Sequence, residues 1–457
     1  MRAVLALGTA LAVCCVALEA APAEKGLQAA PAETDETLIT DLLATVQNLA
    51  RRVEEMERER KEDQRRIREL EETLETVHIA AARGVDEAAA ARQPTAEGAT
   101  GGGIFGQGNL LNPQITAFFD MGGSVATMGD NPAHDRFNLR EVELDFRAAV
   151  SPRADGVLIL AVGEEIHRED GEIEIHHDFE IEEAFLDYHT LTEDLALKFG
   201  KFRNAFGRNN LLHTHDLPQI SRPLAVQAFF GHHGLATLGA SLSWIVPNPW
   251  DRYVELTTDL VNADGGEESP ILGGPNADNP AVLGHLKFFE DVGETGSLEL
   301  GASYLWGRTA AGSGSTGLVL GLDATYFWRD PERPDSRSLL AQGEFFWSDT
   351  DFYDGSSPAV SHRRKGGYAF LQYQPAQYWY TGLRLDYTEF PDRAEDDYDW
   401  GVSPYVSWYL NEALRLRLEY QHHSVEFGGN RDNEAALMLG VTFFIGAHPP
   451  HPYWVNR

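Results

Sequence analysis

The chain has 457 residues, and its 71 acidic residues outnumber the 37 basic ones, which gives a formal net charge of -34. This acidic excess argues against a nucleic-acid-binding protein, which needs a basic face. After residue 20 no apolar run is long enough for a transmembrane helix. Both cysteines, Cys14 and Cys15, lie in that first segment. A mature chain without it would have no disulfide, thiolate metal site or catalytic cysteine.

The first 23 residues have the pattern of a cleaved export signal. Arg2 supplies a short positive region, residues 3–18 are apolar, and residues 21–23 (Ala-Pro-Ala) fit an A-x-A cleavage site. We therefore expect a signal peptide over 1–23 and a short N-terminal segment over 24–37. An uncleaved membrane anchor is the alternative interpretation.

Residues 38–83 are predicted to form an α-helical coiled coil. Apolar residues from Ile39 to Val77 recur in alternating steps of three and four, with Glu and Arg at the flanking positions. Residues 52–57 and 66–71 match the Arg-apolar-x-x-apolar-Glu pattern of trimeric coiled coils. We expect a homotrimer with its coiled coil in the periplasm, where peptidoglycan is a candidate partner. The alternative is a solvated helix. Residues 84–109, rich in Ala and Gly, are predicted to be a linker.

From Pro113 onwards the hydrophobic pattern has a period of two. Alternation over about ten residues that often ends in an aromatic side chain is typical of transmembrane barrel strands. We therefore predict an all-β transmembrane barrel over 110–447, embedded in a lipid bilayer, and a periplasmic tail over 448–457. One apolar face of this kind consists of Leu298, Leu300, Ala302, Tyr304 and Trp306.

The number of alternating segments predicts a barrel of about 16 antiparallel strands. Short turns, such as 192–194 and 411–412, follow the even strands, and longer polar loops follow the odd ones. This asymmetry is typical of outer-membrane barrels, which have short periplasmic turns and long extracellular loops. The segments lie near 113–127, 137–151, 156–168, 173–190, 195–203, 234–247, 252–262, 280–290, 297–308, 317–330, 337–349, 364–375, 377–389, 398–410, 413–427 and 433–446.

The connection over residues 204–233 is long and partly apolar. Loops of this length without strands usually carry function. We expect this loop to fold into the barrel and narrow the pore, whereas a long surface loop is the alternative. The apolar residues expected to pack against the barrel wall are Phe206, Leu211, Leu212, Phe229 and Phe230.

Two segments resemble known families. Residues 200–208 (Gly-Lys-Phe-Arg-Asn-Ala-Phe-Gly-Arg) resemble the Gly-Lys-Phe-x-x-x-Phe-Gly segment of the phosphate-selective porin O/P family and its trimeric relatives. Residues 439–448 and the histidine-rich loop resemble proteins labelled zinc-regulated TonB-dependent outer-membrane receptors. The first resemblance implies a trimeric pore in the outer membrane of a Gram-negative-type cell. The second implies a metal-linked uptake receptor.

A TonB-dependent receptor combines a plug domain with about 22 strands. Residues 110–447 are too few for that many strands with their loops, and residues 24–109 do not resemble a plug. We therefore expect a porin-like channel for the passive diffusion of small solutes or ions. A zinc-linked uptake receptor without a plug domain is the alternative, and the sequence leaves any role of TonB open.

The parity of the strands places charged side chains in the predicted lumen. Where Ile173, Ile175 and Phe179 face lipid, their neighbours face inwards. Acidic ladders on two strands would concentrate cations, which predicts a cation-preferring channel. The alternative is that the carboxylates only solvate the wall. The candidate lumen and constriction residues are Glu141, Glu143, Glu172, Glu174, Asp178, Glu180, Lys201, Arg203, Arg208, Asp216, Arg384, Arg415 and Arg417.

Histidines are concentrated in the same long loop. Neutral imidazoles beside a carboxylate can bind Zn²⁺ or Ni²⁺. A passive pore requires no cofactor, so zinc is an optional ligand here, and ordinary polar loop histidines are the alternative. The sequence has no Gly-x-Ser-x-Gly segment or diagnostic triad, so we expect no enzyme activity. The candidate metal ligands are His213, His215, Asp216, His232 and His233.

Overall fold

The computed structural model describes residues 113–127, 133–169, 172–265, 269–273, 279–310, 314–352, 360–393 and 396–446. The predicted signal peptide, coiled coil, linker and C-terminal tail lie outside these ranges and remain predictions. Within the described ranges, no helix combines the length and the apolar character needed to cross a membrane.

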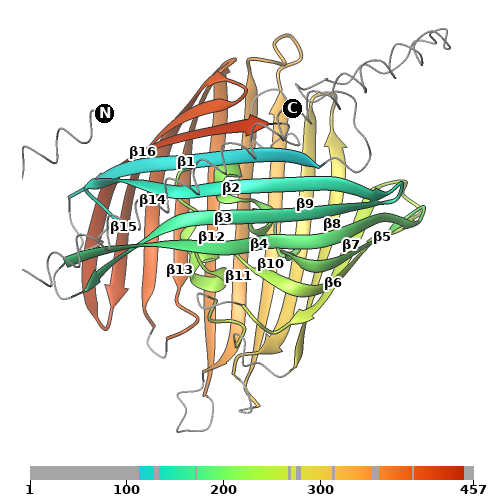
Figure 1. Cartoon of the computed structure of the whole chain (residues 1–457), viewed down its shortest axis with the longest axis horizontal. Helices are drawn as coiled ribbons and strands as arrows, with labels where there is room; N and C mark the ends of the chain where they lie inside the picture. Colours follow the sequence, from blue (N-terminus) through green and yellow to red (C-terminus); the bar gives the residue numbers. More distant parts are fainter. Residues whose placement is uncertain are drawn as a thin grey trace, which may run out of the picture. The chain divides into compact units, whose positions relative to one another are not determined.

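Sixteen antiparallel strands form one closed barrel (Figure 1). Each strand pairs with its neighbours in the sequence, and β1 closes the sheet against β16. The predicted strand number and antiparallel order are therefore confirmed, and the strand ends agree within a few residues. The strands are β1 (Gln114–Ala126), β2 (Arg136–Ser151), β3 (Ala154–Glu169), β4 (Glu172–Thr192), β5 (Leu195–Arg203), β6 (Ala236–Ile245), β7 (Tyr253–Asn262), β8 (Pro280–Val292), β9 (Gly296–Arg308), β10 (Thr316–Arg329), β11 (Ser338–Phe352), β12 (Val360–Ala376), β13 (Trp379–Glu389), β14 (Tyr398–Asn411), β15 (Leu414–Phe427) and β16 (Asn430–Gly446).

Alternation along the strands sorts the side chains between two faces. In β9, Leu300, Tyr304 and Trp306 are exposed on the outer face, whereas Leu305 is fully buried inside the barrel. An exposed apolar face of this extent is unstable in water and suits the hydrocarbon core of a membrane. Other exposed apolar side chains around the barrel are Phe179, Leu238, Leu322, Leu385, Leu418 and Leu439.

The connection between β5 and β6, residues 204–235, is called the inner loop below. It contains the short helices η1 (Asn209–Leu211), η2 (Thr214–Asp216) and α3 (Leu224–Phe230). Its apolar side chains form a buried cluster with inward-facing residues of β7 to β12. The ring of Phe206, for example, lies with its centroid 4.9 Å from that of Phe230 and 5.7 Å from that of Phe346 on β11. Apolar packing therefore holds the inner loop inside the barrel.

Four of the five apolar loop residues expected to contact the wall are buried: Phe206, Leu212, Phe229 and Phe230. Leu211 is different, because it is 47% exposed. The buried positions of η1 are its first two residues, Asn209 and Asn210. The expectation for Leu211 was therefore wrong.

Two β-bulges break the alternation on the strands beside the inner loop. The extra residue is Arg140 in β2 and Glu182 in β4. At a bulge two successive side chains can point to the same side of a sheet. Glu182 and Glu183 are accordingly both buried inside the barrel, and Arg140 and Glu141 both face inwards. The bulges concentrate charged groups at one place on the inner wall.

Replacing Gly200 of β5 with alanine is expected to destabilise the barrel. Gly200 has a φ of +137°, and a Cβ there would lie 2.2 Å from the carbonyl oxygen of Ala184 and 2.6 Å from the Cα of Phe185. Because β4 and β5 would have to separate, we expect a cost of about 2 kcal/mol. The thermal midpoint of unfolding, followed by circular dichroism in detergent, should fall. Gly284→Ala is the control, since the nearest atom to its Cβ, the carbonyl oxygen of Thr257, is 3.9 Å away. An equal fall for both variants would contradict the prediction.

Candidate functional site

The backbone of the inner loop is bound by inward-facing side chains of the barrel. Glu344 of β11 accepts hydrogen bonds from the N–H groups of Arg208 and Asn209, at 3.0 and 2.7 Å. Asp386 of β13 accepts one from the N–H of Leu224 at 3.1 Å. Buried peptide groups need such partners, since an unpaired one costs as much as a lost hydrogen bond. The inner loop is therefore a fixed part of the barrel interior.

Three arginines that were predicted to line the lumen, Arg384, Arg415 and Arg417, lie beneath the inner loop and are at most 1% exposed. They face inwards as expected, but they do not border open space because the loop covers them. Their guanidinium groups donate hydrogen bonds to loop carbonyl oxygens. The pairs are Arg384 with Ser221 at 2.6 Å, Arg415 with Leu217 at 3.0 Å and with His215 at 2.5 Å, and Arg417 with Gln219 at 2.6 Å.

Carboxylates balance the charge beneath the loop. Arg384 lies 2.7 Å from Asp386, and Arg417 lies 2.8 Å from Asp120. Glu419 of β15 accepts from the N–H of Ile220 and from the hydroxyl of Ser221, both at 2.5 Å. Hydrogen bonds to charged groups are about twice as strong as neutral ones. This part of the interior therefore serves to anchor the loop.

A second group of charges lies where the inner loop meets β2 and β4. Nδ1 of His213 lies 2.6 Å from Oε2 of Glu182 and 3.3 Å from Oε2 of Glu143, and its Nε2 lies 3.1 Å from Oε2 of Glu183. Nδ1 of His215 lies 3.2 Å from the same Oε2 of Glu143. We call this group the carboxylate–histidine cluster. Its six members, all buried, are Glu141, Glu143, Glu182, Glu183, His213 and His215.

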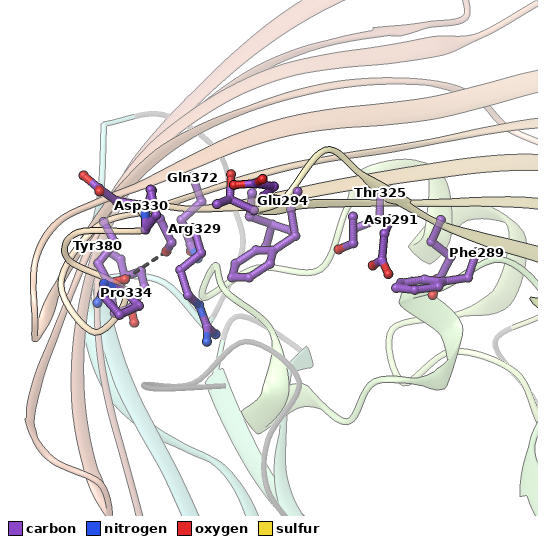
Figure 2. A pocket seen from close by; sticks show the side chains of 18 of the residues that line it. Phe289, Asp291, Glu294, Thr325, Arg329, Asp330, Pro334, Gln372 and Tyr380 are labelled. Atoms are coloured by element: carbon purple, nitrogen blue, oxygen red, sulfur yellow. Dashed lines mark hydrogen bonds between the residues drawn. The ribbon is translucent and has the colours of Figure 1, made fainter.

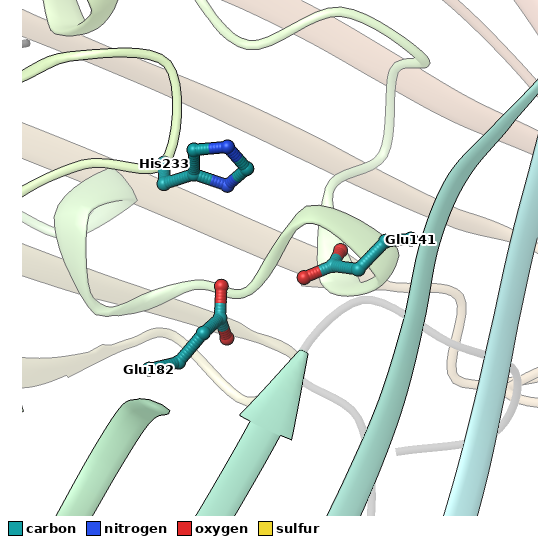
Figure 3. A group of neighbouring side chains, drawn as sticks. All are labelled: Glu141, Glu182 and His233. Carbon is teal, nitrogen blue, oxygen red and sulfur yellow. The ribbon is translucent and has the colours of Figure 1, made fainter. Parts of the chain in front are cut away.

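Arg203, at the end of β5, is the guanidinium that pairs with this cluster in the described part of the chain. Its Nη2 lies 3.1 Å from Oε1 of Glu182, and its backbone N–H donates to Oε1 of Glu183 at 2.7 Å. Glu141 is different. It is 3% exposed, and neither of its carboxylate oxygens has a hydrogen-bond partner among the described residues. Figure 3 shows Glu141, Glu182 and His233 directed towards one common space.

The protonation of His213 follows from its neighbours. Burial and the Arg203 guanidinium each lower the pKa of this loop histidine, but the carboxylates of Glu143 and Glu182 outweigh them and hold its pKa well above the usual range. The raised pKa favours the protonated imidazole, and a metal ion that bound to this ring would have to displace that proton.

The predicted metal ligands divide into two sets. His213 and His215 belong to the carboxylate–histidine cluster. His233 is exposed at its edge, with a ring nitrogen within 4.8 Å of carboxylate oxygens of Glu141 and Glu182. Asp216 and His232 belong to none of the groups of three close metal-ligating side chains found among the described residues. Asp216 is buried elsewhere and His232 is exposed.

Sequence reasoning missed Glu183 as an inward-facing residue. Strict alternation with Glu182 would place its carboxylate on the outer face, and the bulge reverses this. The sequence contains a signal for it. The outward-facing apolar residues of β4 have odd numbers as far as Ile181 and an even number at Leu186. A change of parity within one strand indicates a bulge between the two stretches.

In the described part of the chain, the inner loop borders two cavities that both contain charged residues. The first has a volume of 430 Å³, and its charged and histidine lining residues are Glu165, Asp178, Glu180, Glu182, Asp264, Lys201, Arg203 and His233. The second, shown in Figure 2, has a volume of 600 Å³, and its charged lining residues are Asp291, Glu294, Glu299, Asp330, Arg208 and Arg329. In both cavities carboxylates outnumber guanidinium and ammonium groups.

The remaining candidate lumen residues lie as follows. Lys201 pairs with Glu180 at 2.9 Å in the first cavity, and Arg208 pairs with Glu299 at 2.5 Å in the second. Glu174 and Asp178 are exposed on β4, and Glu172 begins that strand. Glu141 and Glu143 are buried in the carboxylate–histidine cluster and do not line either cavity.

No family model matches this chain. A protein of Aquifex aeolicus (strain VF5), described as uncharacterized, is 28% identical over 352 residues, which cover 69% of this chain and 70% of the relative.

Solved structures of outer-membrane proteins align with most of the barrel at low identity. Pseudomonas putida OprB at high pH aligns with 12% identity and a TM-score of 0.49, over 73% of this chain and 94% of OprB. An anion-selective porin from Comamonas acidovorans aligns with 10% identity and a TM-score of 0.48, over 73% and 99% of the two chains. Salmonella typhi OmpF in complex with daunomycin aligns with 11% identity and a TM-score of 0.47, over 73% and 97%.

Proposed function

We propose that this protein is a porin-like channel of the outer membrane, through which small solutes or ions diffuse passively. The observation that carries the proposal is the closed sixteen-stranded barrel with an apolar outer face and a charged interior. We further propose that the channel prefers cations and that the inner loop forms its constriction.

The outer face supports a place in the membrane. A transmembrane barrel strand needs about 9–11 residues, and strands such as β10 and β15, with 14 residues each, exceed this length. Their outward-facing residues Leu320, Leu322 and Leu418 are 42%, 62% and 46% exposed. A closed sheet also pairs all its edges, as a sheet in hydrocarbon must. The outer membrane is the bilayer that fits the predicted export signal and the short-turn, long-loop asymmetry.

The anchoring of the inner loop supports its role as a constriction. The loop packs against the wall through buried aromatic side chains and is bound by buried arginine and glutamate side chains. A hydrogen bond to a charged group contributes about 1.5–3 kcal/mol, so several of them keep the loop in place. A solute that crosses the barrel would then pass through the spaces that border the loop.

The two cavities beside the loop support a preference for cations. Their lining contains more carboxylates than basic groups. Carboxylates along a narrow path with low-dielectric walls concentrate cations and repel anions. The buried Arg384 and Arg417 do not oppose this effect, because their charges are paired with Asp386 and Asp120 beneath the loop.

Neutralising acidic groups of the first cavity should weaken the cation preference. Asp178→Asn/Glu180→Gln removes two carboxylates and also leaves the ammonium group of Lys201 without its 2.9 Å partner. We expect the K⁺/Cl⁻ permeability ratio, measured from the reversal potential in a KCl gradient across a planar bilayer, to fall by about twofold or more. The wild-type ratio should also approach one as salt rises, because salt screens the carboxylates.

The control for this variant is Glu193→Gln/Glu412→Gln, which removes two exposed carboxylates from short turns. It should leave the permeability ratio near that of the wild type. A wild-type reversal potential that indicates anion preference would refute the proposed selectivity.

Deleting residues 209–231 should raise the single-channel conductance by about twofold or more, because the loop would no longer occupy the interior. The hairpin can close after the deletion, since the N–H of Asn204 already donates to the carbonyl oxygen of Leu235 at 3.1 Å. Leu211→Ser is the control, because this side chain is half exposed and outside the apolar cluster. Unchanged conductance in the deletion variant would show that the loop does not limit the current.

We also propose that three copies assemble through the coiled coil predicted for residues 38–83, which lies outside the described residues. The support is the repeated Arg-apolar-x-x-apolar-Glu pattern. Deleting 38–83 should shift the mass measured by native mass spectrometry in detergent from three chains towards one. Deleting the linker 84–109 should keep the trimer. A wild-type dimer would be inconsistent with the proposal.

A further inference from the structure

We propose that the carboxylate–histidine cluster binds one divalent first-row transition-metal ion, with Glu143, Glu182, His213 and His215 as ligands and Glu141 beside them. Half of these ligands belong to the barrel wall, so the site differs from one made of loop histidines alone. The site does not depend on conduction and would exist in a barrel that carried no current.

The spacing of the donor atoms fits such an ion. Bonds of about 2.0–2.2 Å from Zn²⁺ to nitrogen and oxygen place neighbouring ligand atoms about 3 Å apart. Around Oε2 of Glu143, Nδ1 of His213 lies at 3.3 Å and Nδ1 of His215 at 3.2 Å. Nδ1 of His213 lies 2.6 Å from Oε2 of Glu182. The donors of Glu143, Glu182 and His213 all lie within 4.8 Å of one another, and His215 joins the same oxygen of Glu143 in an overlapping group.

The orientation of both imidazoles is already fixed. Metal-bound histidines usually donate their second ring N–H to a carboxylate or carbonyl group, which orients the ring. Nε2 of His213 lies 3.1 Å from Oε2 of Glu183, which is in turn held by the backbone N–H of Arg203. The ring of His215 is stacked on Phe118, with centroids 3.9 Å apart and planes at 11°. Glu183 and Phe118 thus act as positioning residues.

The charge of the cluster favours a cation. Among the described residues, four glutamates face two guanidinium groups: that of Arg203, which pairs with Glu182 and Glu183, and that of Arg222, which interacts electrostatically with Glu141 and Glu182. Glu141 provides the independent observation, because both its oxygens are buried and have no hydrogen-bond partner in the described structure. One of them lies within 4.8 Å of ligand atoms of Glu143 and His215. A buried carboxylate without a partner is costly, and a nearby dication would offset that cost.

An ion can reach the cluster from the first cavity. Glu182 lines that 430 Å³ cavity together with His233, which belongs to an overlapping group with Glu141 and Glu182. Asp178 and Glu180 line the same cavity and would attract a cation towards it. The site therefore has an entry path bordered by acidic side chains.

The mixture of ligands defines the class of ion. Imidazole combined with carboxylate suits Zn²⁺ and its first-row neighbours, whereas Ca²⁺ and Mg²⁺ prefer oxygen ligands alone. Bound there, the ion would link η2 and its flanking residues to β2 and β4. The two parts of the loop meet at His215, whose carbonyl oxygen accepts from Arg415, while the other arginine contacts lie over 217–221.

The test uses the full chain, purified in detergent and stripped with a chelator. Equilibrium dialysis against Zn²⁺, with metal content measured by mass spectrometry, should show one ion per chain that depends on the cluster. Glu143→Gln keeps the shape of the side chain and removes a ligand charge, so affinity should fall tenfold or more. The control His232→Ala removes an exposed loop histidine outside the cluster and should leave affinity unchanged.

Co²⁺ provides a second measurement that does not depend on stoichiometry. Its visible absorption reports the ligand field, and the spectrum should change in Glu143→Gln and in His215→Ala but not in His232→Ala. Circular dichroism of each variant checks that the barrel is folded. The proposal is overturned if folded Glu143→Gln binds Zn²⁺ as tightly as the wild type, or if the wild type retains no ion.

The two proposals fail separately. A chain that binds one Zn²⁺ at the cluster but carries no current would refute the channel and support the site. A conducting chain without cluster-dependent Zn²⁺ binding would overturn the site and leave the channel intact.

Discussion

The interior of this barrel depends on one constraint: a loop enclosed by a sheet must have partners for its peptide groups. The strands have already used their own backbone groups in the closed ladder, so the partners must be side chains. Three buried arginines supply donors for the carbonyl oxygens of the inner loop, and Glu344, Asp386 and Glu419 supply acceptors for its N–H groups. The charged residues inside the barrel are explained first by this requirement.

Different parts of the barrel wall hold the inner loop by different interactions, apolar packing in one part and charged side chains in others. Strands β7 to β12 hold the aromatic side chains of the loop in a buried apolar cluster. Strands β13 to β15 bind the stretch over 217–221 through arginine and glutamate side chains. Strands β2 and β4 present an excess of carboxylates to the two histidines of the loop. In this last region four buried glutamates face two guanidinium groups among the described residues, and this imbalance makes it a candidate for a cation.

The strands could be predicted because alternation is a local property of the sequence. The alternation of side chains along each strand also predicts that Arg384, Arg415 and Arg417 face the inside of the barrel. It could not show that a loop 163 to 200 positions earlier in the sequence covers them. Glu183 was missed because one extra residue in β4 reverses its face. The partnership of Glu143 with His213 and His215 depends on the fold of the loop, and no spacing in the sequence encodes it. Local sequence patterns therefore predict the strands of the barrel wall, whereas the carboxylate–histidine cluster can be recognised only in the tertiary structure.

The order of the anchors along the chain has a consequence for assembly. Every strand pairs with the one before it, so the sheet can grow as a series of hairpins, with β1 meeting β16 only at closure. The inner loop follows β5, but its anchoring partners Arg415 and Glu419 come 198 or more residues later. During folding its peptide groups must stay hydrated until those strands arrive, because contacts at this separation form late. The loop therefore loses its hydration and gains its anchoring hydrogen bonds only when the sheet closes into a barrel. Burial of the loop and closure of the barrel then occur together.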